Sequence, residues 1–216
     1  MKKKVILFIV LAIFLTQMPL IGPYFSIVNT LIHETGHALM SIITGGKVQS
    51  ISLFSNTEGV TLASHRYWLG GFLTSIAGYL FASFMAYLFL TLIYKRKSKY
   101  VLLILLGTLL ISLLFWIRNA YGLFWILTII AVFTWVLIKG SKKVLDYFAL
   151  FITSLVLVES VTSSFEIMYL SFVSPSRAGD ATNLANMTFL IPTLVWGVVF
   201  FIQALLFARL GLKRYF

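Results

Sequence analysis

Apolar runs of membrane-spanning length alternate with short polar segments along almost the whole chain. A spanning helix needs about 20 mainly apolar residues. Six runs have this character, at residues 5–22, 67–94, 100–117, 121–138, 144–173 and 187–210. A seventh run, residues 26–43, contains Asn29, His33, Glu34 and His37. Because ionisable groups are costly at membrane depth, this run is predicted to form a helix that faces the protein interior. The pattern therefore predicts 6–7 transmembrane helices.

Two of these runs are long for a membrane. At 1.5 Å per residue, residues 67–94 and 144–173 would form helices of about 42–45 Å, against a hydrocarbon core of about 30 Å. We expect both helices to be tilted or broken. Gly70, Gly71 and Gly78 permit either a break or close packing against a neighbouring helix.

Residues 45–64 do not follow a helical pattern. Apolar and polar residues alternate on both sides of "SNTEG", residues 55–59, which is a turn signal. We predict a short β-hairpin at the membrane face, directly after the helix of residues 26–43.

Composition agrees with a membrane protein. The chain has 216 residues, of which 60% are hydrophobic and 11% are charged, whereas soluble domains average about 45–50% and about 25%. We therefore expect one integral membrane domain, residues 1–216, of the all-α polytopic class, in a bacterial plasma membrane. The basic start and apolar run of residues 1–19 lack a small-x-small cleavage pattern, so they are interpreted as an uncleaved first helix. The lack of cysteine excludes disulfides, thiolate catalysis and cysteine-based zinc sites.

The net charge of +11 comes from basic clusters between the apolar runs. Such clusters orient helices and contact anionic lipid headgroups, and no basic face remains for nucleic acid. If seven helices all cross, seven of the 17 basic residues share the side of the amino terminus, the hairpin and Arg118, and ten lie on the other side. The larger cluster favours one orientation and the basic amino terminus favours the other, so the sequence leaves the orientation open.

The chemistry is concentrated in "HETGH", residues 33–37, which fits the H-E-x-x-H pattern. On a helix, His33 and His37 lie on one face, where both imidazoles can bind one zinc ion. Glu34 can approach a zinc-bound water as general base, and zinc lowers the pKa of that water to about 7. This combination is the chemistry of peptide-bond hydrolysis.

A catalytic zinc site needs a third protein ligand. Asp146 lies beside two lysines at a predicted helix start, Glu58 lies in the turn, and His65 is predicted to be interfacial. Asp180 follows a glycine at a helix start, where an Asp is often an N-cap. Glu159 and Glu166 are seven residues apart, so they share one helix face, in a polar stripe that could line a water path. Spacing alone leaves Asp180 and Glu159 as alternatives.

Two blocks of the chain resemble the site-2 proteases, a family of intramembrane zinc metallopeptidases, and in particular a compact bacterial branch without a PDZ domain. These blocks are "HETGHALMSIITGGKVQSISLFSNTEGVT" and "GDATNLANMTFLIPTLVW". The resemblance implies His33, His37 and Asp180 as ligands of Zn²⁺, Glu34 as catalytic base, and a membrane-embedded protein or peptide as substrate. Better-studied members carry Asn-Pro and Leu-Asp-Gly patterns around the aspartate, whereas this chain has "AGDATN". The substrate-positioning Asn is therefore unassigned, with Asn183 and Asn186 nearby.

We expect a zinc-dependent intramembrane endopeptidase, in which the strand at residues 47–53 pairs with an unwound substrate segment by β-augmentation. A catalytically inactive relative that acts as a binding or chaperone module is the alternative. A small transporter is a further one, but the chain shows no internal repeat of the kind common in transporters. The sequence does not determine the substrate, the cleavage site or the oligomeric state.

Overall fold

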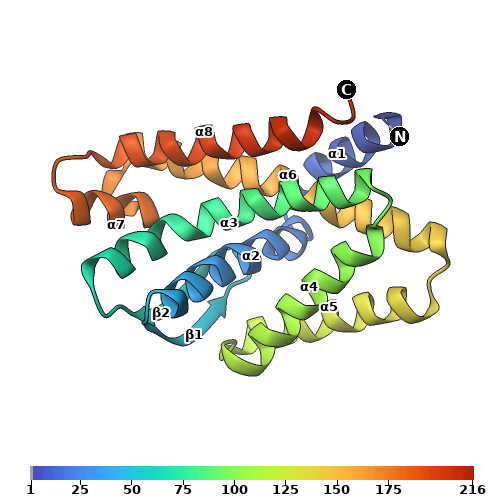
Figure 1. Ribbon diagram of the computed structural model, residues 1–216, viewed down its shortest axis with the longest axis horizontal. Coiled ribbons are helices and arrows are strands. Elements are labelled where there is room, and N and C mark those ends of the chain that lie inside the picture. Colours follow the sequence, from blue (N-terminus) through green and yellow to red (C-terminus); the bar gives the residue numbers. More distant parts are fainter. Residues whose placement is uncertain (1) are drawn as a thin grey trace.

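The computed structural model describes residues 2–216, which form a helical bundle with one small hairpin (Figure 1). In chain order the elements are α1 (Lys2–Thr16), α2 (Gly22–Ile43), β1 (Lys47–Leu53), β2 (Gly59–Ser64), α3 (Trp68–Tyr94), α4 (Ser98–Phe115), α5 (Ala120–Lys139), α6 (Lys142–Val173), the 3-10 helix η1 (Pro175–Arg177), α7 (Gly179–Thr188) and α8 (Thr193–Leu212).

Five of the described helices, α3, α4, α5, α6 and α8, are long and apolar enough to cross a membrane. The predicted class, an all-α membrane protein with a short hairpin after the helix of the histidine motif, is confirmed. Helix α1 has only 15 residues, which is too short to span a hydrocarbon core of about 30 Å by itself. Helix α2 is long enough, but it carries the polar residues of the motif.

Helices α1 and α2 together carry the chain once across the bundle, because they run in the same general direction (Figure 1). Pro19 and Pro23 explain the break between them. Proline disfavours helical geometry in the preceding residue and lacks an N–H, so it is tolerated only in a first helical turn, where Pro23 lies in α2. The helix predicted over residues 5–22 therefore ends at Thr16.

The amino terminus lies beside the carboxyl terminus and the start of α6. The Lys4 ammonium donates a hydrogen bond to the Tyr147 hydroxyl at 2.7 Å, and the Lys2 ammonium lies 4.8 Å from the centre of the Phe216 ring. The assumption that seven helices each cross, which placed the amino terminus with the hairpin, is therefore wrong. The reason is that α1 and α2 share one crossing.

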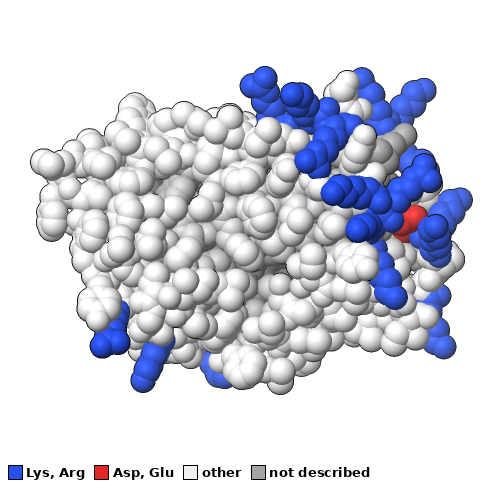
Figure 2. Space-filling view, viewed as in Figure 1, with Lys and Arg blue, Asp and Glu red and all other residues white. Residues whose placement is uncertain are grey.

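With the amino terminus at this end, most of the Lys and Arg residues lie at one end of the bundle, as Figure 2 shows. We call the two ends of the bundle the cationic end and the hairpin end. The cationic end, where α1 begins, α3 and α5 end, α4 and α6 begin, and α8 ends, carries 13 of the 17 basic residues: Lys2, Lys3, Lys4, Lys95, Arg96, Lys97, Lys99, Lys139, Lys142, Lys143, Arg209, Lys213 and Arg214. The hairpin end carries the other four: Lys47, Arg66, Arg118 and Arg177.

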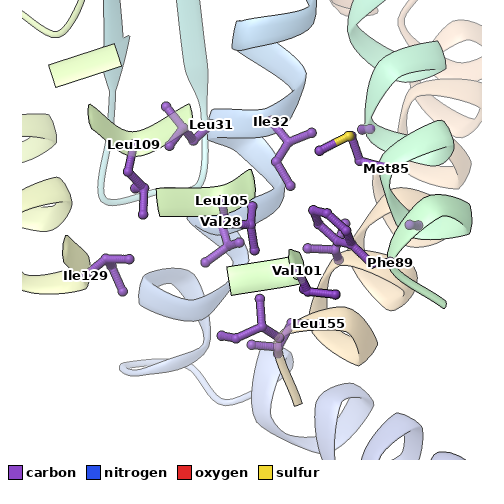
Figure 3. Close-up of a cluster of buried hydrophobic side chains, with 14 of the residues drawn as sticks. Val28, Leu31, Ile32, Met85, Phe89, Val101, Leu105, Leu109, Ile129 and Leu155 are labelled. Atoms are coloured by element: carbon purple, nitrogen blue, oxygen red, sulfur yellow. The ribbon is translucent and has the colours of Figure 1, made fainter. Parts of the chain in front are cut away.

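Helix α2 lies inside the bundle, as its polar residues require. One face packs Val28, Leu31 and Ile32 into the main hydrophobic core, among side chains of α3, α4, α5 and α6 (Figure 3). The adjoining face carries Asn29 and His33, which line a cavity. The helix is therefore apolar where it packs and polar where it faces the cavity.

Helices α3 and α6 are long and unbroken, with 27 and 32 residues. Of the two roles predicted for the glycines of α3, close packing applies at Gly78. A Cβ atom on Gly78 would lie 2.5 Å from the His37 Nε2 atom, well inside van der Waals contact. This glycine allows α3 to approach the histidine face of α2.

Only one of the two outer strand edges of the hairpin, that of β2, lacks backbone hydrogen bonds to another described segment. Strand β1 pairs antiparallel with β2, and its other edge is occupied by the loop between α4 and α5. There the Ile51 N–H donates to the Trp116 carbonyl at 2.8 Å, and the Asn119 side chain bonds the backbone of Leu53. Within the described part of the chain, the backbone of β2 makes no backbone hydrogen bond outside the hairpin.

The segment after α6 departs from the expected final helix. Residues 174–186 lie between the predicted runs 144–173 and 187–210, and most of them belong to η1 and to α7. The last span was predicted to begin at residue 187, yet α7 continues to Thr188 and α8 begins after Pro192. Proline cannot continue a helix from its preceding residues, so the apolar run divides there.

The charge asymmetry predicts the orientation of the protein. Because cytoplasmic segments carry an excess of Lys and Arg, the cationic end is expected to face the cytoplasm and the hairpin end the opposite side. The chain has no cysteine, so single cysteines at the exposed positions Ser55 and Lys143 can report this. In intact cells a membrane-impermeant maleimide should label S55C, and it should label K143C only after lysis. The reverse pattern would contradict the assignment.

Candidate metal centre

His33 and His37 lie one turn apart on α2, and their side chains converge. The two Nε2 atoms are 2.9 Å apart, and the ring centres are separated by 4.6 Å. This is the arrangement expected from positions i and i+4 of a helix. His37 is only 7% exposed, so the pair lies within the bundle.

Asp180 brings a carboxylate from a distant part of the chain to this pair. Its Oδ2 atom is 3.2 Å from the Nε2 atom of His33 and 3.2 Å from that of His37. One ligand atom from each of the three residues lies within 4.8 Å of the other two. Asp180 lies in the first turn of α7, and the N-cap of this helix is Ala178. Asp180 is thus not the N-cap that its position after a glycine suggested. The carboxylate therefore faces the histidines.

The hydrogen bonding around His37 fits a metal ion. Its Nδ1 atom lies 2.6 Å from the Thr74 carbonyl oxygen, which can only accept, so Nδ1 carries a proton and donates. In the neutral ring Nε2 then presents a lone pair. A lone pair, a second imidazole nitrogen and a carboxylate oxygen therefore meet at one point, and a cation between them resolves that arrangement. Two imidazoles and one carboxylate form a known ligand set for catalytic zinc.

Glu34 is next to the histidines and is held by the hairpin. The Thr61 hydroxyl on β2 lies 2.6 Å from a carboxylate oxygen of Glu34 and donates to it. The backbone of Gly59 also packs against this side chain, because a Cβ atom at position 59 would lie only 2.6 Å from the other carboxylate oxygen of Glu34. Glu34 is 4% exposed. The strand thus fixes the carboxylate of the residue that directly follows His33 in the chain.

All four of these residues line one cavity of about 680 Å³ between α2, α3, α6, α7 and the hairpin. Glu159, the alternative third ligand, also lines this cavity, but it is absent from the described group of residues that could hold a metal. Glu58 and His65 also line the cavity, but they do not belong to the group of His33, His37 and Asp180. Asp146 lies at the cationic end, beside Lys142 and Lys143.

Of the two asparagines near Asp180, only Asn183 is among the residues that line the cavity.

Several residues that shape the site were not assigned to it from the sequence, although Gly78 was predicted to permit close helix packing. These are Thr61, which holds Glu34; Thr74, which orients His37; Gly78; and Tyr79, whose ring centre lies 4.6 Å from that of His33. "GVT" at residues 59–61 was noticed, but its role depends on where the strand folds back. The other three come from α3, and no local pattern relates α3 to α2.

Gly78 gives a direct test of this geometry. Alanine at this position would place a methyl group against both imidazoles, so we expect the histidines to be displaced and zinc affinity to fall on the order of 10- to 100-fold, as when an orienting neighbour of a ligand is lost. Metal analysis and competition with a chelator on purified protein measure this change.

Gly107 on α4 is the matched control, since a Cβ atom there would meet nothing within 4 Å. G107A should bind zinc as the unmodified chain does. Equal affinity for zinc in G78A and G107A would show that α3 does not constrain the histidine pair.

The chain was also compared with known proteins. The family model described as Peptidase M50B-like matches residues 6–211. Comparisons with curated proteins and with solved structures gave no match. The family match covers nearly the whole bundle, including both histidines, Glu34 and Asp180. A membrane-spanning bundle that carries this motif and matches this family over such a length belongs to the M50B-like peptidases, the site-2 protease family of membrane proteases.

Proposed function

We propose that this protein is a zinc-dependent intramembrane endopeptidase of the site-2 type, with His33, His37 and Asp180 as zinc ligands and Glu34 as catalytic base. The observation that supports it best is the convergence of three ligand atoms next to a buried carboxylate, within a cavity of a membrane-spanning bundle. Membership in a peptidase family supports the same activity.

The chemistry divides between the ion and the protein. Zinc, when bound, supplies a Lewis acid that activates water near neutral pH. Glu34 accepts a proton from the attacking water as its oxygen bonds to the carbonyl carbon of the substrate. Glu34 then gives that proton to the amine nitrogen as the C–N bond breaks. The Thr61 hydroxyl holds the carboxylate in place for both transfers.

We infer that the hairpin aligns the substrate through β2, and not through β1, the strand expected from the sequence. Strand β1 was expected to pair with the substrate, but its outer edge is occupied by the loop at residues 116–119. Strand β2 has the unpaired edge, lines the cavity and contacts Glu34. An extended peptide that pairs with β2 by β-augmentation would lie along the cavity beside Glu34.

Zinc content tests the ligand set. Purified wild-type protein and E159A should contain close to one zinc per chain, because Glu159 lies outside the three-ligand group, whereas D180A should lose it. E34Q should keep its zinc, because Glu34 is assigned as base and not as ligand. Elemental analysis of the four proteins measures this.

The same variants separate an active protease from an inactive relative. Loss of a general base costs on the order of 10²- to 10⁴-fold in rate, so E34Q should cleave a transmembrane peptide at least about 10²-fold more slowly than wild type. A wild-type protein without zinc after reconstitution would contradict the proposal. E34Q with full biological function would favour a binding or chaperone role.

Disulfide trapping tests which strand the substrate contacts. Val60 on β2 and Ser52 on β1 are cross-strand partners, so their side chains share a face at neighbouring strands. In the cysteine-free E34Q protein, V60C should cross-link to peptides that carry one cysteine near the cleavage site, and S52C should cross-link much less. Equal cross-linking, or a preference for S52C, would reject β2 as the docking strand.

A further inference from the structure

The cavity gathers nearly all the acidic groups of a basic protein. The chain has six acidic residues and a net charge of +11. Five of the six line this one cavity: Glu34, Glu58, Glu159, Glu166 and Asp180. The only Lys or Arg among the described lining residues is Arg177. The cavity is therefore acidic inside a molecule that is otherwise cationic.

The proposed chemistry uses only two of these five carboxylates, Glu34 and Asp180. Glu159 and Glu166 lie on the cavity face of α6, two helical turns apart, which is about 10 Å along the helix axis. Within residues 2–216, no Lys or Arg nitrogen lies within 4.0 Å of either carboxylate. Arg177 shares the cavity without forming an ion pair with them.

A third polar group that lines the cavity, on α2, lacks a hydrogen-bond partner. Asn29, on α2, lines the same cavity and is only 5% exposed, yet its Oδ1 atom has no hydrogen-bond partner in the described structure. A buried acceptor without a donor is unfavourable, because it has lost its hydrogen bond to water. Asn29 lies one turn before His33 on the same helix face and lines the same cavity as Glu159 and Glu166. We call Asn29, Glu159 and Glu166 the acidic wall.

The hydrogen-bond chemistry of this wall specifies the ligand that fits it. Two carboxylates and an amide oxygen are all acceptors, so they need a group with several donors. A lysine ammonium offers three N–H donors and an arginine guanidinium five, and neither can accept. Hydrogen bonds between such cations and carboxylates are also stronger than neutral ones. An acidic side chain would repel the two carboxylates, and an apolar one would leave them without a counter-charge, which is costly at membrane depth.

We propose that the acidic wall is a specificity subsite that binds the positively charged side chain of a Lys or Arg in the substrate segment. This inference rests on the proposed endopeptidase function and names its substrate class: membrane segments that place one basic residue near the cleaved bond. The basic side chain is neutralised in the subsite while the backbone lies beside the metal centre. Selection therefore acts on a charge, which few membrane segments carry.

Peptide binding tests the subsite without requiring cleavage. Fluorescent transmembrane peptides that are identical except for Lys, Met or Glu at one position, with that position moved along the segment, are titrated into the zinc-loaded E34Q protein in nanodiscs. At the matching position the Lys peptide should bind about tenfold or more tightly than the Met peptide, the effect expected for a charge-assisted hydrogen bond. The Glu peptide should bind most weakly.

Variants of the wall identify the residues responsible. E159Q and E166Q, each in the E34Q background, should reduce the ratio of Lys to Met affinity toward one. E166K should favour the Glu peptide over the Lys peptide, a reversal that a merely structural role would not produce. Asp146 lies outside the cavity at the cationic end, so D146N is the matched control and should keep the full ratio. Zinc content measured on every variant shows that the metal centre is intact.

The outcomes separate this inference from the proposed function. Equal binding of Lys and Met peptides at every position, a ratio that both E159Q and E166Q leave unchanged, or no binding of any peptide would overturn the subsite. If the wild-type protein, which keeps Glu34, cleaves peptides without a preference for Lys, the subsite is overturned and the endopeptidase function is kept. A Lys preference in a protein that cleaves nothing would keep the subsite and reject the endopeptidase.

Discussion

The cost of placing ionisable groups in a membrane controls the arrangement of this protein. Helix α2 carries a glutamate and two histidines in a segment that would otherwise face lipid, and each would be unfavourable there. The bundle therefore surrounds α2, with α3 against the histidines and the hairpin against Glu34. The long helices α3 and α6 supply most of the walls, while α2 completes the crossing that α1 begins.

This enclosure also builds the candidate metal centre. No single element contains the site, because α2 supplies two candidate ligands and the candidate base, α7 supplies Asp180, and α3 supplies the carbonyl that orients His37. Glycines at positions 59 and 78 remove the side chains that would keep these elements apart. The close packing that isolates the polar groups from lipid is thus the same packing that brings the ligands together.

The basic and the acidic residues lie in different parts of the molecule. Basic residues collect at the cationic end (Figure 2), and five of the six acidic residues line the cavity beside the hairpin. Keeping them apart leaves the carboxylates of the acidic wall without cations of the protein's own. A substrate that enters the cavity meets an environment unlike the rest of the surface.

The sequence by itself determined the class of protein, five of the six to seven spanning helices that it predicted, the hairpin and the H-E-x-x-H motif. These follow from hydropathy, alternation and i, i+4 spacing, which are local properties. It could not determine the third ligand. Spacing left Asp180 and Glu159 open, and only the position of α7 brings one of them to the histidines.

The tertiary structure alone decided the side on which the amino terminus lies, the strand whose edge is free, and the convergence of five acidic residues on one cavity. Each of these depends on contacts between segments far apart in the chain. Such contacts arise from packing, which leaves no periodic trace in the sequence.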